Sequence, residues 1–414
     1  MVLLTMAHPD PSGHCRQDLE NDVHFFDAAD VPETDHWEAW LAYADLLTGA
    51  GDLRGEAIRL EHHCEIGDGD PARLAAAYAE VERQWGLDGL REDGSWRLTW
   101  SRGFIDEACF RLAKDTQPQR RELVERLLTD HPRTATVDLT DPEQWEGALI
   151  DVLLSHPAAH RLRALELHLT DYHRSAEHSA ISLAGRRRPR LERMYFGYDF
   201  EYLYEDSEGS TGNRINPLDY HHKGLVQADV WDSLPALRTL ELEGAFLFHF
   251  VKHDSLTRLR ARGPVISDGS IFDFGWTTGL QSLEVEIGSD VFGCLCPVEQ
   301  LDELKASKYP NLENLDLSEA EFDDTSYEVV SALADSSVLP LLRSLSIRDL
   351  TISQMDCEGD PLTALAELAP RFGHLDLYVG DVIDIEDADD EEVDRVLSQF
   401  GLSQIHTTGD HGDD

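Results

Sequence analysis

The sequence predicts an α/β solenoid, with parallel strands on a concave face, helices outside, and a small helical module at the N-terminus. Three observations predict it. An apolar triplet recurs at a nearly constant interval, a proline precedes most copies at a fixed distance, and stretches with helical periodicity lie between the copies. Strands that alternate with helices at a period of about 20 to 50 residues are typical of solenoids, because each unit buries its apolar face only against its neighbours.

The triplet has the form apolar-x-x-apolar-x-apolar and recurs about every 30 residues within residues 100–386, which gives about nine or ten irregular repeats. The middle residues of the triplets serve as register marks: Ala108, Val137, Leu165, Met194, Leu240, Leu259, Leu283, Leu315, Leu345 and Leu375. Side chains alternate between the two faces of a strand. The apolar positions are therefore expected to point inward, and the residues between them to form an open face.

Prolines support the same period. One lies five residues before each of six register marks: Pro132, Pro189, Pro235, Pro310, Pro340 and Pro370. Proline ends a helix and keeps the residue before it away from the helical region, which turns the chain toward the next strand. Apolar residues at intervals of three and four predict helices between the strands, over 117–129, 142–155, 298–308, 325–335 and 361–369.

Several segments depart from the repeat. An insertion near 198–230 lengthens one repeat, and the glycine-rich stretch that follows it predicts repeats with short loops and few helices. Residues 387–400 predict an amphipathic helix that caps the end of the array, as repeat arrays require. We expect residues 1–30 to be a flexible arm and residues 401–414 to be a disordered tail, because neither segment shows hydrophobic periodicity.

A helical module is predicted for residues 31–99. The residues Trp40–Asp45 read WLAYAD, Gly51–Leu60 read GDLRGEAIRL, and Trp100–Ile105 read WSRGFI. These strings resemble the bacterial repeat-companion domain, a short module that precedes divergent leucine-rich-repeat-like arrays in some large bacterial genomes. The resemblance implies a bacterial protein in which a helical module is followed by repeats, and it brings no defined activity with it.

The repeats themselves resemble irregular bacterial leucine-rich repeats of the ribonuclease-inhibitor type. One family feature differs, because the asparagine that usually follows the strand is replaced by Thr170, Gly244, Glu319 or Asp349. Leucine-rich horseshoes generally bind proteins on the strand face. For this chain that expectation is an analogy at the level of the fold.

The charge of the chain limits its partners. The 35 Lys and Arg residues stand against 81 Asp and Glu residues, and the formal net charge is −46. Because like charges repel, nucleic acid and anionic membranes are poor partners. No apolar stretch reaches the length of about 18 residues that a membrane-spanning helix needs. No signal peptide is visible and the six cysteines are scattered, so we expect a cytoplasmic protein with reduced thiols.

No pattern of catalytic residues stands out. The sequence has no Gly-x-Ser-x-Gly elbow, and the glycines of residues 263–269 lack the Gly-Lys-Ser/Thr end of a phosphate-binding loop. Three local clusters of ligating residues lack the spacing of known metal sites: His62-His63-Cys64, His221-His222 and Cys294-x-Cys296. We therefore predict no cofactor and no metal, and whether the first two clusters bind a metal stays open.

The open face carries the residues predicted to bind a partner. Carboxylates recur between the second and third apolar positions of the repeats: Glu166, Glu241, Glu284, Asp316 and Asp376. Tyrosines lie on or near the same face: Tyr195, Tyr198, Tyr202, Tyr204 and Tyr378. Such a surface would attract a basic protein or peptide by charge and anchor it by aromatic contacts. The general acidity of the chain accounts for the carboxylates equally well.

The main prediction is thus a non-catalytic scaffold for protein–protein interaction, with two other functions left open. A metal-dependent enzyme would use a site in the irregular middle repeats, at Asp219, His221, His222 and His249. An acidic mimic of nucleic acid would expose carboxylates spaced like phosphates along a convex edge. The sequence does not identify the partner, the pathway or the oligomeric state.

Overall fold

The computed structural model describes the chain in segments, namely 31–88, 96–111, 142–169, 176–198, 229–244, 248, 251–264, 277–288, 296–323, 325–352, 355, 357, 359–380, 383–385 and 390–400. The chain divides into two compact units. The helical unit comprises residues 1–88 with 100–104, and the sheet unit comprises residues 89–99 with 105–414. The predicted arm, most of the predicted insertion and the predicted tail lie outside the described residues.

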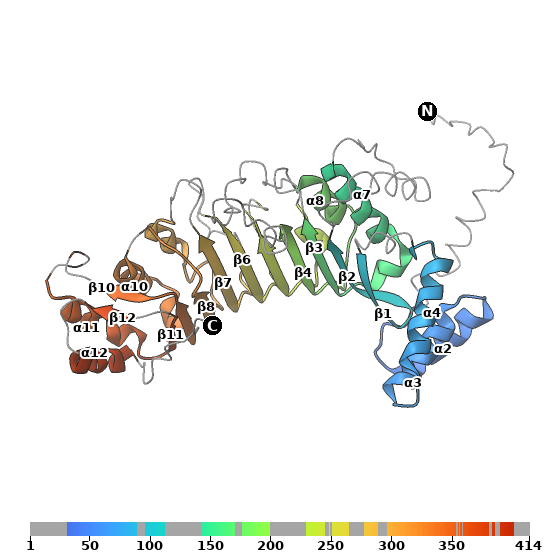
Figure 1. Cartoon of the computed structure of the whole chain (residues 1–414), viewed down its shortest axis with the longest axis horizontal. Helices are drawn as coiled ribbons and strands as arrows, with labels where there is room; N and C mark the ends of the chain where they lie inside the picture. Colours follow the sequence, from blue (N-terminus) through green and yellow to red (C-terminus); the bar gives the residue numbers. More distant parts are fainter. Residues whose placement is uncertain are drawn as a thin grey trace, which may run out of the picture. The chain divides into compact units, whose positions relative to one another are not determined.

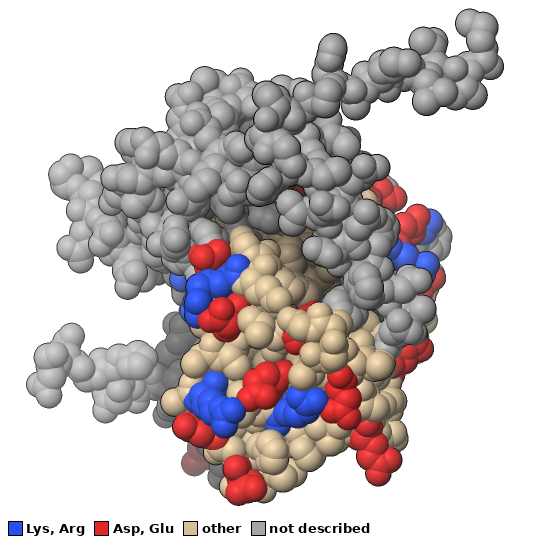
Figure 2. Space-filling model, turned by 90° about the vertical axis from the view of Figure 1, so that its right-hand side faces the viewer, with Lys and Arg blue, Asp and Glu red and all other residues tan. Residues whose placement is uncertain are grey.

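Three helices form the described part of the helical unit: α2 (Trp37–Gly49), α3 (Arg54–Glu65) and α4 (Pro71–Gln84). The Asp70 side chain accepts a hydrogen bond from the backbone N–H of Ala72, and Pro71 stands in the first turn, so the sequence marks the start of α4. A buried apolar cluster joins Trp40 and Tyr43 of α2 to Ile58 of α3, and it also includes Phe104. On the face drawn in Figure 2, basic and acidic groups lie next to one another rather than in separate patches.

The turn between β1 (Trp96–Ser101) and β2 (Phe104–Arg111) belongs to the helical unit. Both of its central residues have positive φ, 52° at Arg102 and 79° at Gly103, as a two-residue hairpin turn requires. The Arg102 backbone N–H donates to Glu61 at 2.6 Å, and its guanidinium pairs with Asp35 at 2.8 Å. The predicted domain boundary at residue 99 therefore falls inside β1, because the end of this hairpin packs with the helices.

The sheet unit contains an open sheet of ten strands in the order in which they occur along the chain, β1 to β9 followed by β11 (Figure 1). The strands after β2 are β3 (Ala164–Leu169), β4 (Arg193–Tyr198), β5 (Thr239–Glu243), β6 (Arg258–Pro264), β7 (Ser282–Gly288), β8 (Asn314–Leu317), β9 (Ser344–Ile347) and β11 (Asp376–Val379). Every pair from β2 onward is parallel. A separate parallel pair joins β10 (Leu350–Ile352) to β12 (Ile383–Ile385).

The strand register follows the predicted marks over most of the sheet. The residues that pair across successive strands are Ala108, Leu165, Met194, Leu240, Leu259, Leu283, Leu315 and Leu345. All of these side chains are at most 3% exposed, so they lie on the covered face of the sheet. The fold class is thereby confirmed as α/β with a mostly parallel sheet.

Two of the predicted marks are wrong. Leu345 pairs with Leu377 rather than Leu375, because α11 (Pro361–Phe372) continues through Pro370 and the strand starts only at Asp376. The proline here lies inside the last turn of the helix and does not end it. The second error concerns Val137. β2 pairs directly with β3, so no strand around this residue lies between them, and residues 134–139 themselves are outside the described part of the chain.

Helices connect some of the strands, and short 3-10 turns connect others. The described α-helices of the sheet unit are α7 (Pro142–Ser155), α8 (Glu177–Ala184), α10 (Ser326–Asp335), α11 and α12 (Asp390–Leu397). The helix predicted over 298–308 is a 3-10 helix, η5 (Val298–Glu303), and the helix predicted over 117–129 lies outside the described residues. The predicted C-terminal cap contains α12 and η7 (Ser398–Phe400), and Phe400 packs on Phe372 of α11.

The contact between α7 and α8, which lie side by side in Figure 1, shows how closely these connections pack. The Ser182 hydroxyl of α8 donates to the Gly147 carbonyl of α7 at 2.8 Å. A Cβ added at Gly147 would lie 2.9 Å from the backbone of His178, so a glycine is needed at this crossing. Among the described helices, none has the length and apolarity needed to cross a membrane.

The two faces of β7 give a direct test of the register. Leu283 is fully buried, and its neighbour Ser282 points to the open face. We predict that Leu283→Ala lowers the free energy of unfolding of the sheet unit by about 2–5 kcal/mol, since it leaves a cavity. The matched change Ser282→Ala should alter it by less than about 0.5 kcal/mol. Chemical denaturation monitored by circular dichroism measures both values, and equal effects would contradict the assigned faces.

Candidate functional site

The register brings the outward-pointing residues of neighbouring strands into one row across the sheet. Taken from β2 to β11, this central row is Cys109, Glu166, Tyr195, Glu241, Arg260, Glu284, Asp316, Ser346 and Tyr378. Five of the predicted site residues therefore fall in the row at the expected places. Asp376 does not, because it pairs with Ser344, and Tyr378 takes its position. The two-residue error in the β11 register explains this exchange.

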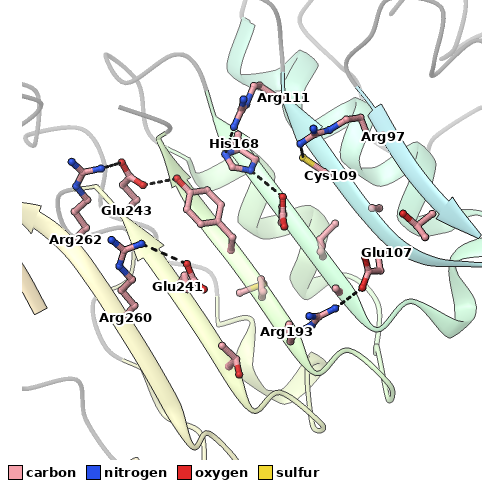
Figure 3. Close-up of a pocket in the computed structure, with 18 residues that line it drawn as sticks. Arg97, Glu107, Cys109, Arg111, His168, Arg193, Glu241, Glu243, Arg260 and Arg262 are labelled. Atoms are coloured by element: carbon pink, nitrogen blue, oxygen red, sulfur yellow. Dashed lines mark hydrogen bonds and ion pairs between the residues drawn. The ribbon is translucent and has the colours of Figure 1, made fainter. Parts of the chain in front are cut away.

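A hollow of about 700 Å³ lies on the open face over β1 to β6. Figure 3 shows its charged side chains reaching from the strands toward one another. Five arginines and four glutamates line it: Arg97, Arg111, Arg193, Arg260, Arg262, Glu107, Glu166, Glu241 and Glu243. The expected acidic face is thus wrong for this part of the sheet. The hollow is close to neutral, although the whole chain carries a charge of −46.

Strand β6 supplies the positive charge at one side of the hollow. Arg260 stands between Glu241 of β5, at 3.9 Å, and Glu284 of β7, at 2.8 Å. Two residues further along β6, on the same face, Arg262 stands between Glu243 at 3.0 Å and Glu286 at 2.6 Å. Opposite charges that face one another on neighbouring strands stabilise a sheet by about 0.2–1 kcal/mol per pair. The arginines therefore neutralise carboxylates that would otherwise repel one another.

Tyr195 connects the two sides of the hollow. Its ring stacks on that of His168, with centroids 4.3 Å apart and planes inclined by 23°. Its hydroxyl donates to Glu243 at 2.8 Å. Because the carboxylate of Glu243 is bound in turn by Arg262, the tyrosine joins the ion pairs of β5 and β6 to the imidazole on β3. Tyr195 therefore lies on the open face, as predicted from the sequence, and its ring and hydroxyl are both held by neighbouring side chains.

At the other side of the hollow, Cys109, Glu166 and His168 form a cluster on β2 and β3. Arg97 Nη2 donates to the sulfur of Cys109 at 3.1 Å, and Arg111 Nη2 lies 3.2 Å from His168 Nδ1. A guanidinium group can only donate. His168 Nδ1 therefore accepts, and the ring proton sits on Nε2, which donates to Glu166 at 3.3 Å.

These contacts shift the titration of Glu166. The hydrogen bond from His168 is the main cause that lowers its pKa to about 2, while burial opposes the shift and Cys109 and Arg97 add to it. The carboxylate is consequently ionised at neutral pH. Its side chain is 52% exposed, so it also remains accessible from the hollow.

The other predicted residues are not brought into this site. Tyr198 lies in β4, but its side chain is not described, and Tyr202, Tyr204, Asp219, His221, His222 and His249 lie outside the described residues. His62 and His63 lie on α3 of the helical unit, where His62 packs against Trp37 with ring centroids 4.9 Å apart. Within the described ranges, His62, His63 and Cys64 do not form a three-ligand metal cluster.

Sequence reasoning missed the arginines and the cluster around Cys109. A signal for the arginines was present, because the register marks alone put Arg260 between Glu241 and Glu284. Opposite charges at neighbouring positions of a row, rather than the acidic majority of the row, are the pattern that would have found them. No comparable signal marks Cys109, since it meets Glu166 only when β2 pairs directly with β3.

Comparisons with known proteins add no relative. No family model, no curated protein and no solved structure matches this chain. The resemblances to the repeat-companion domain and to leucine-rich repeats therefore stay predictions that rest on the residues quoted for them. The site has to be judged from its own geometry.

We predict that the pKa of Glu166, followed by NMR in buffer freed of metal ions, lies near 2 and rises toward the usual range in the variant His168→Gln. The pKa of Glu166 in the folded chain is depressed from its ordinary value of 4.5. The contact therefore stabilises the fold above about pH 4.5 and is lost as the pH falls toward 2. An unchanged pKa in His168→Gln would show that the imidazole is not the main cause.

Proposed function

We propose that this chain is a non-catalytic scaffold for protein–protein interaction, and that its sheet unit is a leucine-rich-repeat-like solenoid behind a repeat-companion-like helical unit. The observation that carries the proposal is the open face of the sheet. Ten strands in chain order present long polar side chains in aligned rows, and a hollow of about 700 Å³ opens among them. Aligned rows on a fixed backbone suit recognition of an extended surface, because the backbone changes little when a partner binds.

The net charge supports a basic protein or peptide as the partner. A chain with a charge of −46 attracts positive molecules over distances of about a Debye length, which raises the rate of encounter. At contact the situation differs, because Arg260 and Arg262 already occupy the carboxylates of β5 and β7. We propose that lysines and arginines of the partner compete with these arginines for Glu241 and Glu284.

Strands β8 and β11, which lie beyond the hollow, add carboxylates for which fewer arginines of the chain compete. The Asp316 carboxylate accepts hydrogen bonds from the backbone and hydroxyl of Ser318, and Asp376 is exposed at the last strand of the sheet. Tyr378, at 60% exposure, offers an aromatic contact next to them.

We predict that the double variant Glu241→Gln, Glu284→Gln lowers the affinity for a partner captured from native lysate by about tenfold or more at low salt, which corresponds to about 1.4 kcal/mol. Isothermal titration calorimetry measures the dissociation constant. The matched control Glu299→Gln, Asp302→Asn removes the same charge from exposed positions of η5 and should leave the affinity within about twofold. Equal losses in both variants would contradict a role of the open face.

We predict further that Arg260→Gln strengthens the binding of a basic partner, because it frees Glu241 and Glu284 from their internal competitor. The affinity should rise several-fold at low salt, and the gain should shrink as the salt concentration increases. A weaker complex with Arg260→Gln would show that the guanidinium itself contacts the partner. It would exclude competition between Arg260 and the partner for Glu241 and Glu284.

A further inference from the structure

The corner of the hollow at β2 and β3 gathers three side chains that ligate metals in other proteins. A ligand atom of Cys109, one of Glu166 and one of His168 all lie within 4.8 Å of one another. Among the described residues this is the only group of three such side chains that approach so closely. All three line the hollow. Figure 3 shows Cys109 and His168 on neighbouring strands at its edge.

We infer that Cys109, Glu166 and His168 bind one divalent transition metal ion of the zinc class, with a coordination position left open to the hollow. Thiolate and imidazole ligands select zinc, cobalt or iron over magnesium and calcium, which prefer oxygen alone. Three protein ligands with an open fourth position are typical of zinc sites that bind a further molecule, whereas structural sites have four protein ligands.

The distances agree with such a site. His168 Nε2 lies 3.3 Å from Glu166 Oε2. Two ligands that each lie about 2.0 Å from a tetrahedral zinc are about 3.3 Å apart. A metal can therefore bridge these two atoms with little change in their separation. The cysteine sulfur lies within 4.8 Å of a ligand atom of each of these two residues and would have to move closer to take the third position.

Neighbouring residues hold the three ligands in place. The stacking of Tyr195 on His168 fixes the plane of the imidazole, and Glu243 fixes the tyrosine hydroxyl. The N–H group that Arg97 donates to Cys109 stabilises a thiolate. Groups that orient metal ligands in this way typically change metal affinity by about 10- to 100-fold when removed.

Metal binding requires two proton changes at the cluster. The thiol of Cys109 releases its proton to solvent, and the ring proton of His168 moves from Nε2, where the metal binds, to Nδ1. Arg111 donates to Nδ1 in the structure, so its guanidinium has to turn away from the ring. The charges of the thiolate and the carboxylate then neutralise the ion. Arg111 is therefore a competitor of the metal, and its removal should favour binding.

This inference goes beyond the proposed scaffold and stands whether or not the open face binds a protein. An ion at this corner would let the hollow accept a molecule through a carboxylate, imidazole or thiolate group at the open position. The site would also explain why a cysteine, a glutamate and a histidine share one small area of a face on which most other glutamates pair with arginines.

The test is a titration of the full chain with Co²⁺, followed by displacement with Zn²⁺. We expect one equivalent of cobalt to bind and to produce a charge-transfer band from thiolate to cobalt. Cys109→Ser should abolish the band, and His168→Gln and Glu166→Gln should each lower the affinity by about tenfold or more. Arg111→Gln should raise it. The control Cys64→Ser changes a half-buried thiol of the helical unit and should leave the titration unchanged.

A second measurement uses the unaltered chain and does not depend on the folding of any variant. Zn²⁺ should slow the alkylation of Cys109 by iodoacetamide, as quantified by mass spectrometry of the modified peptide, and should leave Cys64 reactive. The inference is overturned if no charge-transfer band forms, if the band survives in Cys109→Ser, if Arg111→Gln weakens binding, or if Zn²⁺ does not protect Cys109.

Discussion

Parallel pairing in register is the constraint on which the open face depends. Side chains alternate along a strand, so a shift of one residue would move every outward residue to the covered face. Leu165, Met194 and Leu240 hold this register because each is buried at the same height of its strand. The charged rows exist only because these aliphatic side chains stay aligned from strand to strand.

The sequence predicted the sheet well where the repeat is regular and poorly where helix ends decide the register. Spacing alone located the marks from Leu165 to Leu345, since burial demands an aliphatic side chain at each of them. The prediction failed at β11. How far α11 continues past Pro370 depends on packing, and the spacing of residues in the sequence carries no information about that packing. It also failed at Val137, where an apolar triplet does not form the strand next to β2.

These two errors explain what the prediction of the site missed. A strand at Val137 would have separated Cys109 from Glu166, so their contact could not be foreseen. The charge balance was missed for a different reason. The prediction rested on the acidic majority of the row, whereas Arg260 and Arg262 each pair with the carboxylates at the same position of the strands on either side. Electrostatics on a sheet depends on pairs of neighbours, which a single position in the sequence does not reveal.

The ion pairs give the face a property that simple acidity would not. Each exposed pair contributes about 0–1 kcal/mol, so a partner can exchange one pair for another at small cost. A bare row of carboxylates would bind any cation, while under the proposed function a row already occupied by arginines would bind only partners whose charges are placed to replace them. In the proposed complex, specificity would therefore follow from the placement of charge more than from its sum.

Carboxylate footprinting of the chain with and without its captured partner tests this account most directly. Carbodiimide labelling followed by mass spectrometry reports which carboxylates the partner covers. The account predicts protection of Glu241, Glu284 and Asp316 in the complex, and unchanged labelling of Glu299 and Asp302 on η5. Protection confined to η5 or to the helical unit, with the open face labelled as in the free chain, would contradict it.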